Sequence, residues 1–269
     1  ATETAPQLIS SFEGRARAFV EIQQGCDHRC TFCIIPFARG PNRSVCVDRI
    51  VKQVQLLTKQ GFKEIVLTGV DICSFGADMS GTSTLGELIQ HLLSVVPDLP
   101  RLRLSSLDPA KIDAKIFEVL ANEPRLMSHL HLSVQALDDT ILKRMKRRHL
   151  RADVENVIFH AKIARPGVAF GADLIAGFPT ETENQFNNTV RAVKELELTH
   201  LHVFPYSPRP GTPAAKMPQV NDNTRKQRAK LLRKIGLNKQ ANYFSSLIGS
   251  FANIVCEPKG RGYTEHYAP

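Results

Sequence analysis

Apolar residues follow two alternating patterns along most of the chain, one typical of β-strands and one typical of amphipathic helices. Six short apolar segments are each followed by a stretch with helical periodicity, which is the order found in parallel β/α folds. The expected strands are 18–24, 64–70, 101–106, 129–135, 170–176 and 200–206. The pattern therefore predicts an α/β protein in which residues 14–220 form a partial (β/α)6 barrel, since six strands are too few for a closed eight-stranded barrel.

The helical pattern is clearest after residue 84, where apolar residues recur at intervals of three and four. These positions are Leu85, Leu88, Ile89, Leu92, Leu93 and Val96. Gly61 is expected to follow the end of the first helix, and Asp138 to precede the fourth. Thr182 and Gln185 have the spacing of a capping box, which predicts the start of the sixth helix.

The remaining segments predict a different organisation on either side of the barrel. Residues 1–13 have no periodicity and are expected to be a linker from an N-terminal domain outside this sequence. Five prolines in 204–218 exclude a regular element there. A basic helix is expected over 221–249, and 250–269, with a strand at 251–256, is expected to begin a further domain.

Composition limits the class of protein. The chain has 269 residues, 42% of them hydrophobic and 23% charged, as in ordinary globular proteins. No run of 18 apolar residues predicts a membrane span, so we expect a cytoplasmic protein. The formal net charge of +9 favours a polyanionic partner. Between Thr224 and Cys256 the chain has Lys and Arg but no acidic residue.

Two basic segments are candidates for nucleic-acid contact. The first follows Thr224 and comprises Arg225, Lys226, Arg228, Lys230, Arg233, Lys234 and Lys239; the second runs from Lys143 to Arg151. Lys226, Lys230, Arg233 and Lys234 fall on one helical face. Each segment, taken alone, could equally be a solvated helix face.

Cys26, Cys30 and Cys33 carry the most specific chemistry, because their spacing is C-x3-C-x2-C. Three thiolates so close together can bind three irons of a [4Fe–4S] cluster and leave the fourth iron open to a small molecule. Structural zinc usually takes four ligands in two separated pairs, and no second pair follows here. Cys46, Cys73 and Cys256 are scattered and are expected to be small core residues.

Polar or special residues follow each expected strand. They include Gln24-Gly25, Thr68 to Asp71, Ser105 to Pro109, Ser133 to Gln135, Ile175 to Pro179 and Tyr206 to Pro208. In parallel β/α folds the carboxyl ends of the strands form one edge, where ligands bind. The sequence therefore predicts a single site that includes the cysteines, although each short motif alone could be only a turn.

The aromatic Phe32 before Cys33 completes a motif that resembles the C-x3-C-x-aromatic-C signature of the radical S-adenosylmethionine (SAM) superfamily. Further segments resemble its methylthiotransferases: Arg39 to Ser44, Leu132 to Gln135, Asp173 to Glu181 and Tyr206 to Pro213. The Arg-Gly-x-x-Arg-Ser spacing and Thr68 to Asp71 resemble the branch called MtaB. This resemblance implies a TIM-like radical SAM barrel and 2-methylthiolation of N6-threonylcarbamoyladenosine beside the tRNA anticodon.

The family pattern also implies a cofactor set and roles for particular residues. A [4Fe–4S] cluster on Cys26, Cys30 and Cys33 would cleave SAM reductively to a 5′-deoxyadenosyl radical, with an electron from a flavodoxin or ferredoxin. The SAM-binding residues would be Phe32, Thr68, Gly69, Asp71, Ser133, Gln135, Asp173 and Gly177. The RNA-binding residues on the basic helix would be Arg225, Lys226, Lys230, Arg233 and Lys234.

The same resemblance implies two parts that this sequence lacks. A second [4Fe–4S] cluster, the sulfur-donating one, is expected in an N-terminal domain, and residues 250–269 would begin a truncated TRAM-like RNA-binding β-barrel. The fragment alone is therefore expected not to complete methylthiolation. Cys46 stands where the family pattern predicts proline, and Cys73 where it more often has a polar residue.

Three alternative functions fit parts of the sequence. The target could be isopentenyladenosine in tRNA, or an aspartate of a ribosomal protein, as in neighbouring branches of the family. A non-enzymatic reading also stands, in which an iron–sulfur or zinc centre stabilises an RNA-binding module whose basic helix contacts phosphate.

Overall fold

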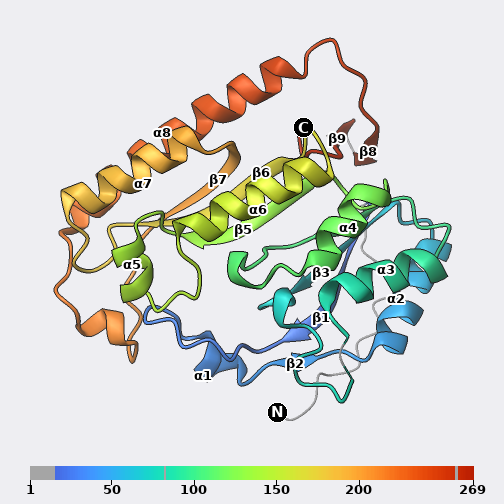
Figure 1. The fold of residues 1–269 in the computed structure, drawn as a ribbon, viewed down its shortest axis with the longest axis horizontal. Coiled ribbons are helices and arrows are strands. Elements are labelled where there is room, and N and C mark those ends of the chain that lie inside the picture. Colours follow the sequence, from blue (N-terminus) through green and yellow to red (C-terminus); the bar gives the residue numbers. More distant parts are fainter. Residues whose placement is uncertain (1–15, 82, 258–259) are drawn as a thin grey trace.

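The computed structural model describes residues 16–81, 83–257 and 260–269, so the expected linker 1–13 lies outside the described residues. It is an α/β structure with two parallel sheets and helices packed against them (Figure 1). All six expected strands are present, within a few residues of their predicted bounds.

The first sheet has the order β2–β1–β3–β4. Its strands are β1 (Arg17–Gln24), β2 (Arg43–Ser44), β3 (Glu64–Gly69) and β4 (Leu102–Leu104). The strands β1, β3 and β4 are parallel, whereas β2 is antiparallel to β1 and pairs Ser44 with Gln23. The two-residue β2 is too short to leave a hydrophobic pattern in the sequence, so it was not predicted.

The second sheet has the order β5–β6–β7, and its strands are all parallel. They are β5 (His129–Gln135), β6 (Ala169–Ala176) and β7 (Leu198–Pro205). Isolated parallel bridges join Leu102 of β4 to Leu126, just before β5, and Leu107, just after β4, to Leu132 of β5. The carboxyl ends of the strands of both sheets therefore lie at neighbouring edges.

The helices agree with the predicted periodicity. They are α1 (Ile35–Arg39), α2 (Val47–Lys59), α3 (Leu85–Val95), α4 (Ala114–Asn122), α5 (Asp139–Arg144), α6 (Arg151–Ala164), α7 (Glu183–Glu195) and α8 (Asp222–Ser246). Short 3₁₀ turns cover Ile72–Ser74, Pro109–Lys111 and Pro213–Lys216. The predicted capping box is confirmed, because Thr182 Oγ1 accepts from Gln185 N and Gln185 Oε1 accepts from Thr182 N.

Apolar and polar side chains alternate along β5, so one kind faces the helices and the other faces the space between the sheets. Leu130, Leu132 and Val134 are fully buried in the main hydrophobic core. The residues between them, His129, His131 and Ser133, point the other way, because successive strand side chains lie on opposite faces. The core therefore fixes the register that gathers polar side chains between the two sheets.

The C-terminal elements pack against the second sheet. Helix α8 runs along β7 (Figure 1), where the Cα of Gly236 lies so close to Leu201 that a Cβ would come within 3.0 Å of it. Strands β8 (Ile254–Glu257) and β9 (Arg261–Thr264) form an antiparallel hairpin. The expected strand at 251–256 thus begins three residues later. Among the described residues, the helices are too short or too polar to cross a membrane.

Candidate metal and cofactor site

The loop that carries the three cysteines leaves the carboxyl end of β1 through a turn that requires glycine. Gly25 has a φ of +70°, and a Cβ there would lie 1.8 Å from the carbonyl oxygen of Pro41. The Cys26 N–H donates to the Gly40 carbonyl at 3.0 Å, and the Cys33 N–H donates to the Cys30 carbonyl at 3.2 Å. These main-chain bonds fix the backbone of the loop, and the sulfurs of Cys26 and Cys33 in turn accept from the backbone N–H groups of His28 and Ile35.

Thr31 attaches the other side of this loop to elements that follow strands of the second sheet. Its N–H donates to the Met145 carbonyl at 3.0 Å, and its hydroxyl donates to the Arg144 carbonyl at 2.8 Å, both at the end of α5. Its carbonyl accepts from the N–H of Ala214, in the 3₁₀ turn after β7, at 2.9 Å. The cysteine loop thus contacts the segments that follow β5 and β7.

Gln23, which is fully buried, connects the cysteine loop to the end of β3. Its side-chain nitrogen donates to the Gly25 carbonyl at 2.7 Å and to Asn42 Oδ1 at 2.6 Å. Its side-chain oxygen accepts from the N–H groups of Val70 at 3.0 Å and Asp71 at 2.7 Å. One amide therefore sets the distance between the cysteines and the segment 68–71.

The three cysteine sulfurs fit a multinuclear cluster better than a single ion. In the described part of the chain, the groups of potential ligand atoms lying within 4.8 Å of one another do not contain all three cysteines. A tetrahedral zinc ion would bring its thiolates to within about 4 Å of each other, given Zn–S bonds of about 2.3 Å. A [4Fe–4S] cluster binds each thiolate through a different iron, which suits the wider spacing.

Burial governs the protonation of the cysteines. Burial raises the pKa of Cys26 to about 11 and also raises that of Cys33. The free thiols are therefore protonated at neutral pH, and binding iron would displace their protons. The Arg147 guanidinium offers a compensating charge, because Nη1 lies 3.7 Å from Cys30 Sγ.

A buried polar network lies beneath the loop. Asp108 accepts from Arg147 Nη2 at 3.0 Å, and its carboxylate oxygens lie 3.6 Å from His28 Nδ1 and 3.7 Å from His149 Nδ1. His28 Nε2 lies 3.2 Å from Asp71 Oδ2. Burial would raise the pKa of Asp108, but His149, Arg147 and the Ala110 N–H lower it to about 2. Asp108 is therefore a fixed negative charge.

The predicted SAM-binding residues occupy the strand ends around this loop. Thr68, Gly69 and Asp71 end β3 and begin the following turn, next to Gln23. The Ser133 carbonyl accepts from Arg147 Nη2 at 3.0 Å, and Gln135 takes a left-handed φ of 68° at the end of β5. Arg147 contacts both Ser133 and Cys30, and Gln23 contacts both Gly25 and Asp71. These contacts place the two groups of residues near the cysteine loop.

The other three predicted residues lie around the end of β6. The Phe32 ring packs edge-on against Phe178, with centroids 6.4 Å apart. Gly177 has a φ of +73° and its Cα faces Arg225 so closely that a Cβ would lie 2.5 Å from Arg225 Cγ. The Asp173 carboxylate points between the sheets, 3.0 Å from His131 Nε2.

The basic helix shows two kinds of cation. Arg225 Nη1 donates to the Tyr206 carbonyl at 3.0 Å, Arg233 donates twice to the Val203 carbonyl, and Lys226 pairs with Asp222 at 2.6 Å. Lys230 and Lys234 are exposed and have no side-chain partner among the described residues. Arg225 and Arg233 therefore attach α8 to the sheet, while the two lysines are free for solution partners.

The second basic segment is partly structural. Arg144 donates to Thr180, Arg147 and His149 are buried in the network beneath the loop, and Arg151 bonds Glu155 and Glu195. Arg144, Arg147 and Arg151 therefore have acidic or carbonyl partners within the chain, whereas Lys143, Lys146 and Arg148 are exposed.

The expectation that the remaining cysteines are core residues was wrong for two of them. Cys46 and Cys256 are exposed. Cys73 is partly buried, its pKa is raised by burial, and its Sγ accepts from the Asp108 N–H at 3.3 Å. Cys46 precedes α2 and Cys256 lies on a hairpin strand, where no hydrophobic periodicity would have placed them inside.

Sequence reasoning missed Gln23, His28 and Arg147 as site residues. Gln23 lies within a strand whose alternation predicts only which face it occupies, and Arg147 lies in a basic run that suggested an outer surface. His28 had the clearest signal, since it lies between the first two cysteines. Asp108 was foreseen only as one of many polar residues after a strand.

Comparison with known proteins agrees with this geometry. The model of the radical SAM superfamily matches residues 20–193. The chain belongs to the radical SAM superfamily. Membership implies a [4Fe–4S] cluster and SAM, and the cysteine loop offers the ligands for that cluster.

Several curated proteins are similar along nearly the whole chain. The threonylcarbamoyladenosine tRNA methylthiotransferase MtaB of Rickettsia prowazekii is 52% identical over 267 residues, covering 99% of this chain and 63% of that protein. MtaB of Bacillus subtilis is 37% identical, covering 96% of this chain and 59% of that protein. The tRNA-2-methylthio-N(6)-dimethylallyladenosine synthase of Ehrlichia canis is 36% identical, covering 90% and 55%. The radical SAM chain thus spans about three-fifths of the length of such relatives.

Solved structures share the fold. The radical SAM methyltransferase TsrM from Kitasatospora setae aligns with a TM-score of 0.60 at 19% identity, covering 75% of this chain and 38% of that chain. The coproporphyrinogen III oxidase HemN of Escherichia coli aligns with a TM-score of 0.56 at 16% identity, covering 90% and 55%. At these identities the likeness concerns the fold alone.

Proposed function

We propose that this chain is the radical SAM core of an enzyme that 2-methylthiolates N6-threonylcarbamoyladenosine in tRNA, next to the anticodon. The observation that carries the proposal is the 52% identity to an MtaB over 99% of the chain, which includes the cysteine loop and every strand end around it. The similarity to a dimethylallyladenosine synthase is lower, at 36%. We therefore favour the threonylcarbamoyl substrate over an isopentenyl one or a ribosomal-protein aspartate.

The proposed catalytic core is a partial, TIM-like (β/α)6 barrel formed by the two sheets, with the cluster held by Cys26, Cys30 and Cys33. When bound, a reduced [4Fe–4S] cluster supplies the electron that cleaves SAM to methionine and a 5′-deoxyadenosyl radical. The residues of the chain position the reactants and exclude water. Gln23 holds the cysteine loop at a fixed distance from Asp71, and the Phe32–Phe178 contact closes the apolar side of the loop.

The SAM-binding residues are proposed to surround this loop. Thr68, Gly69 and Asp71 are available for the amino group of SAM, and Ser133 and Gln135 for its ribose. Phe32 and Gly177 would border its adenine. Asp173, predicted with them, lies deeper on β6, 3.0 Å from His131 Nε2, and would face the target base instead. Apart from Phe32, which lies in the cysteine loop, and Asp173, which lies within β6, these residues are at or near the carboxyl end of a strand, where parallel β/α folds bind ligands.

We also propose the parts and partners that complete the reaction. A second [4Fe–4S] cluster would come from an N-terminal domain, electrons from a flavodoxin or ferredoxin, and RNA contacts from the lysines of α8. The hairpin β8–β9 would begin a TRAM-like RNA-binding barrel, and the enzyme would act in the cytoplasm. The chain alone, without the N-terminal domain, would not complete methylthiolation.

The test uses the full-length protein, reconstituted anaerobically with iron and sulfide and given reductant and SAM. Nucleoside mass spectrometry should detect the methylthio group on tRNA that carries threonylcarbamoyladenosine. Modification only of isopentenyladenosine tRNA would assign the chain to the neighbouring branch. Failure to release 5′-deoxyadenosine, despite a complete iron content, would favour the non-enzymatic RNA-binding module.

A further inference from the structure

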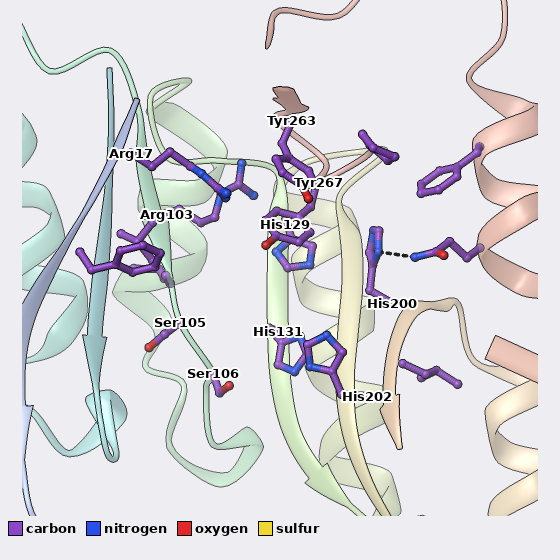
Figure 2. Close-up of a pocket in the computed structure, with 17 residues that line it drawn as sticks. Arg17, Arg103, Ser105, Ser106, His129, His131, His200, His202, Tyr263 and Tyr267 are labelled. Atoms are coloured by element: carbon purple, nitrogen blue, oxygen red, sulfur yellow. Dashed lines mark hydrogen bonds between the residues drawn. The ribbon is translucent and has the colours of Figure 1, made fainter. Parts of the chain in front are cut away.

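A cavity of about 500 Å³ lies between the two sheets, directly below the strand ends that surround the cysteine loop. Figure 2 shows that four histidines line one wall. They are His129 and His131 on β5, and His200 and His202 on β7. The opposite wall includes Arg17 of β1, Arg103 of β4 and Ser105. Polar side chains therefore line part of a cavity whose remaining walls are apolar, from Phe19, Val66, Leu104 and Phe244 among others.

Several polar atoms of the cavity wall have no hydrogen-bond partner among the described residues. They are both ring nitrogens of His129, Nε2 of His200 and Oγ of Ser105. His129 and His200 are only 6% exposed, and a buried polar atom without a partner is costly. Burial lowers the pKa of both histidines, so their rings are neutral at pH 7 and each offers a donor. The wall is therefore suited to a polar ligand.

Above these rings, Asp173 holds two further histidines. Its Oδ1 lies 3.0 Å from His131 Nε2 and 3.3 Å from His202 Nδ1. The position of His131 depends on Gly171, since a Cβ at 171 would lie 2.2 Å from its Nδ1. The side chain of His202 is 60% exposed. Asp173 therefore fixes one nitrogen of the His202 ring and leaves Nε2 for a ligand that enters from outside.

Two arginines, Arg17 and Arg103, line this cavity. Together with Arg101 they lie within 3.0–3.9 Å of the buried carboxylate of Glu64, and Arg17 also pairs with Glu257. These three guanidinium groups offset the carboxylates of Glu64, Glu257 and Asp173, so the side chains leave no excess of negative charge that would repel a ligand carboxylate. Binding of that carboxylate depends on its hydrogen bond to His202 Nε2.

The cavity lies far enough below the proposed reaction centre to receive a substituent of the target base. Ser133, whose carbonyl accepts from Arg147 beside Cys30, is two residues along β5 from His131. Strands rise about 3.3 Å per residue, so His131 lies about 7 Å deeper than Ser133. A base held at the level of Ser133 would direct a substituent of several atoms to the level of His131 and His202.

We propose that the cavity receives the N6 substituent of the target adenosine, and that His202, oriented by Asp173, binds the carboxylate of a threonylcarbamoyl group. This inference rests on the proposed function. A threonylcarbamoyl group carries a carboxylate, a hydroxyl and a ureido unit that can satisfy the polar wall. A dimethylallyl group has no hydrogen-bonding atoms and would leave these side chains unpaired, which is a strong basis for rejecting it.

The experiment measures binding by the full-length, reconstituted protein without reductant, so that no turnover is needed. The probes are anticodon stem-loop RNAs that carry threonylcarbamoyladenosine, its methyl ester, or dimethylallyladenosine. The free acid should bind about tenfold more tightly than the ester, as expected for one charge-assisted hydrogen bond. In His202→Leu the ratio of the two affinities should fall to about one. His202→Gln, which keeps a hydrogen-bond donor in a different position, should give an intermediate ratio.

His91→Leu, which changes an exposed histidine on α3 outside the cavity lining, is the matched control and should keep the wild-type ratio. The inference is overturned if wild type does not distinguish acid from ester, or if His202→Leu keeps the wild-type ratio. A misfolded variant would also bind both RNAs alike, so the ratio is compared only between proteins that load the wild-type amount of iron. If the ratios behave as expected but no methylthiolation occurs, the proposed function fails while the carboxylate site stands.

Discussion

The side-chain oxygen of Gln23 lies 2.7 Å from the backbone nitrogen of Asp71, while the nitrogen of the same amide donates to the Gly25 carbonyl. A single buried residue on β1 therefore connects the loop that carries the cysteines to the turn after β3. The β1–β3 ladder ends at Gln23 and Gly69, and beyond it both segments are irregular, so this amide extends the connection between them past the last paired residues. Gln23 is accordingly a positioning residue for the proposed cluster and for the residues of SAM binding.

Replacing Gln23 with Leu should destabilise the protein and reduce cluster loading. The N–H groups of Val70 and Asp71 would lose their acceptor in a buried environment, and Asn42 would lose its donor. We expect a decrease of about 3 kcal/mol in the free energy of unfolding, measured by denaturant titration. Gln24→Leu is the control, since the Gln24 side chain donates to Glu21 near the surface and its loss should change stability by less than about 0.5 kcal/mol. Equal effects of the two variants would contradict this role of Gln23.

Cys26→Ala, Cys30→Ala and Cys33→Ala should each remove about four irons per chain from the reconstituted full-length protein. The reason is that a cluster held by three thiolates loses a corner ligand in each variant. The same variants should release no 5′-deoxyadenosine from SAM. Cys46→Ala removes an exposed thiol outside the loop and should keep the wild-type iron content. Iron and sulfide analysis checks this expectation, and a full iron content in Cys30→Ala would refute the ligand assignment.

Asp108 should make stability fall steeply in acid. Its pKa is about 2 in the folded protein and about 3.8 in the unfolded chain. Because the folded value is the lower one, the contribution is fully present above pH 4 and disappears as the pH falls from 4 towards 2. This difference in pKa corresponds to about 2 kcal/mol in the free energy of unfolding.

Asp108→Asn should remove this part of the acid response. The variant should be less stable than wild type at pH 7, since Arg147 loses its buried carboxylate partner. Between pH 4 and 2 the difference between the two proteins should shrink by about 2 kcal/mol, in urea titrations at each pH. A constant difference across that range would show that Asp108 is not the group that titrates.

The sequence predicted the strands and helices well because their signals are local. The alternation in 129–135 and the capping box of Thr182 and Gln185 depend only on near neighbours, and both are present in the structure. β2 was missed because two residues carry no period. The exposed Cys46 was misplaced because the apolar character of a thiol does not show which way it points.

The site was predicted less completely, because its contacts join residues far apart in the sequence. The cysteine spacing identified the loop. Its contacts could not be read from the sequence, because Arg147 is 117 residues from Cys30 along the chain and Gln23 is 48 residues from Asp71. The cluster of four histidines in the cavity was not predicted, for the same reason. His131 and His202 became neighbours only when β5, β6 and β7 aligned, with Asp173 between them.

Lys230 and Lys234 on α8 should supply part of the salt-dependent affinity for tRNA. Both are exposed and have no side-chain partner among the described residues, whereas Arg225 and Arg233 bond backbone carbonyls. Replacing both lysines with Ala should reduce the slope of log affinity against log salt by about 1.5, because each phosphate contact contributes about 0.7–0.9.

The matched control removes the same charge elsewhere. Lys52 and Lys59 are exposed on α2, which lies on the other side of the molecule from α8 in Figure 1. Lys52→Ala with Lys59→Ala should leave the salt slope close to that of wild type, although the net charge changes equally. Filter binding of tRNA between low and physiological salt measures both slopes. If the two double variants behave alike, the affinity follows net charge alone and α8 is merely a solvated helix that contacts no phosphate.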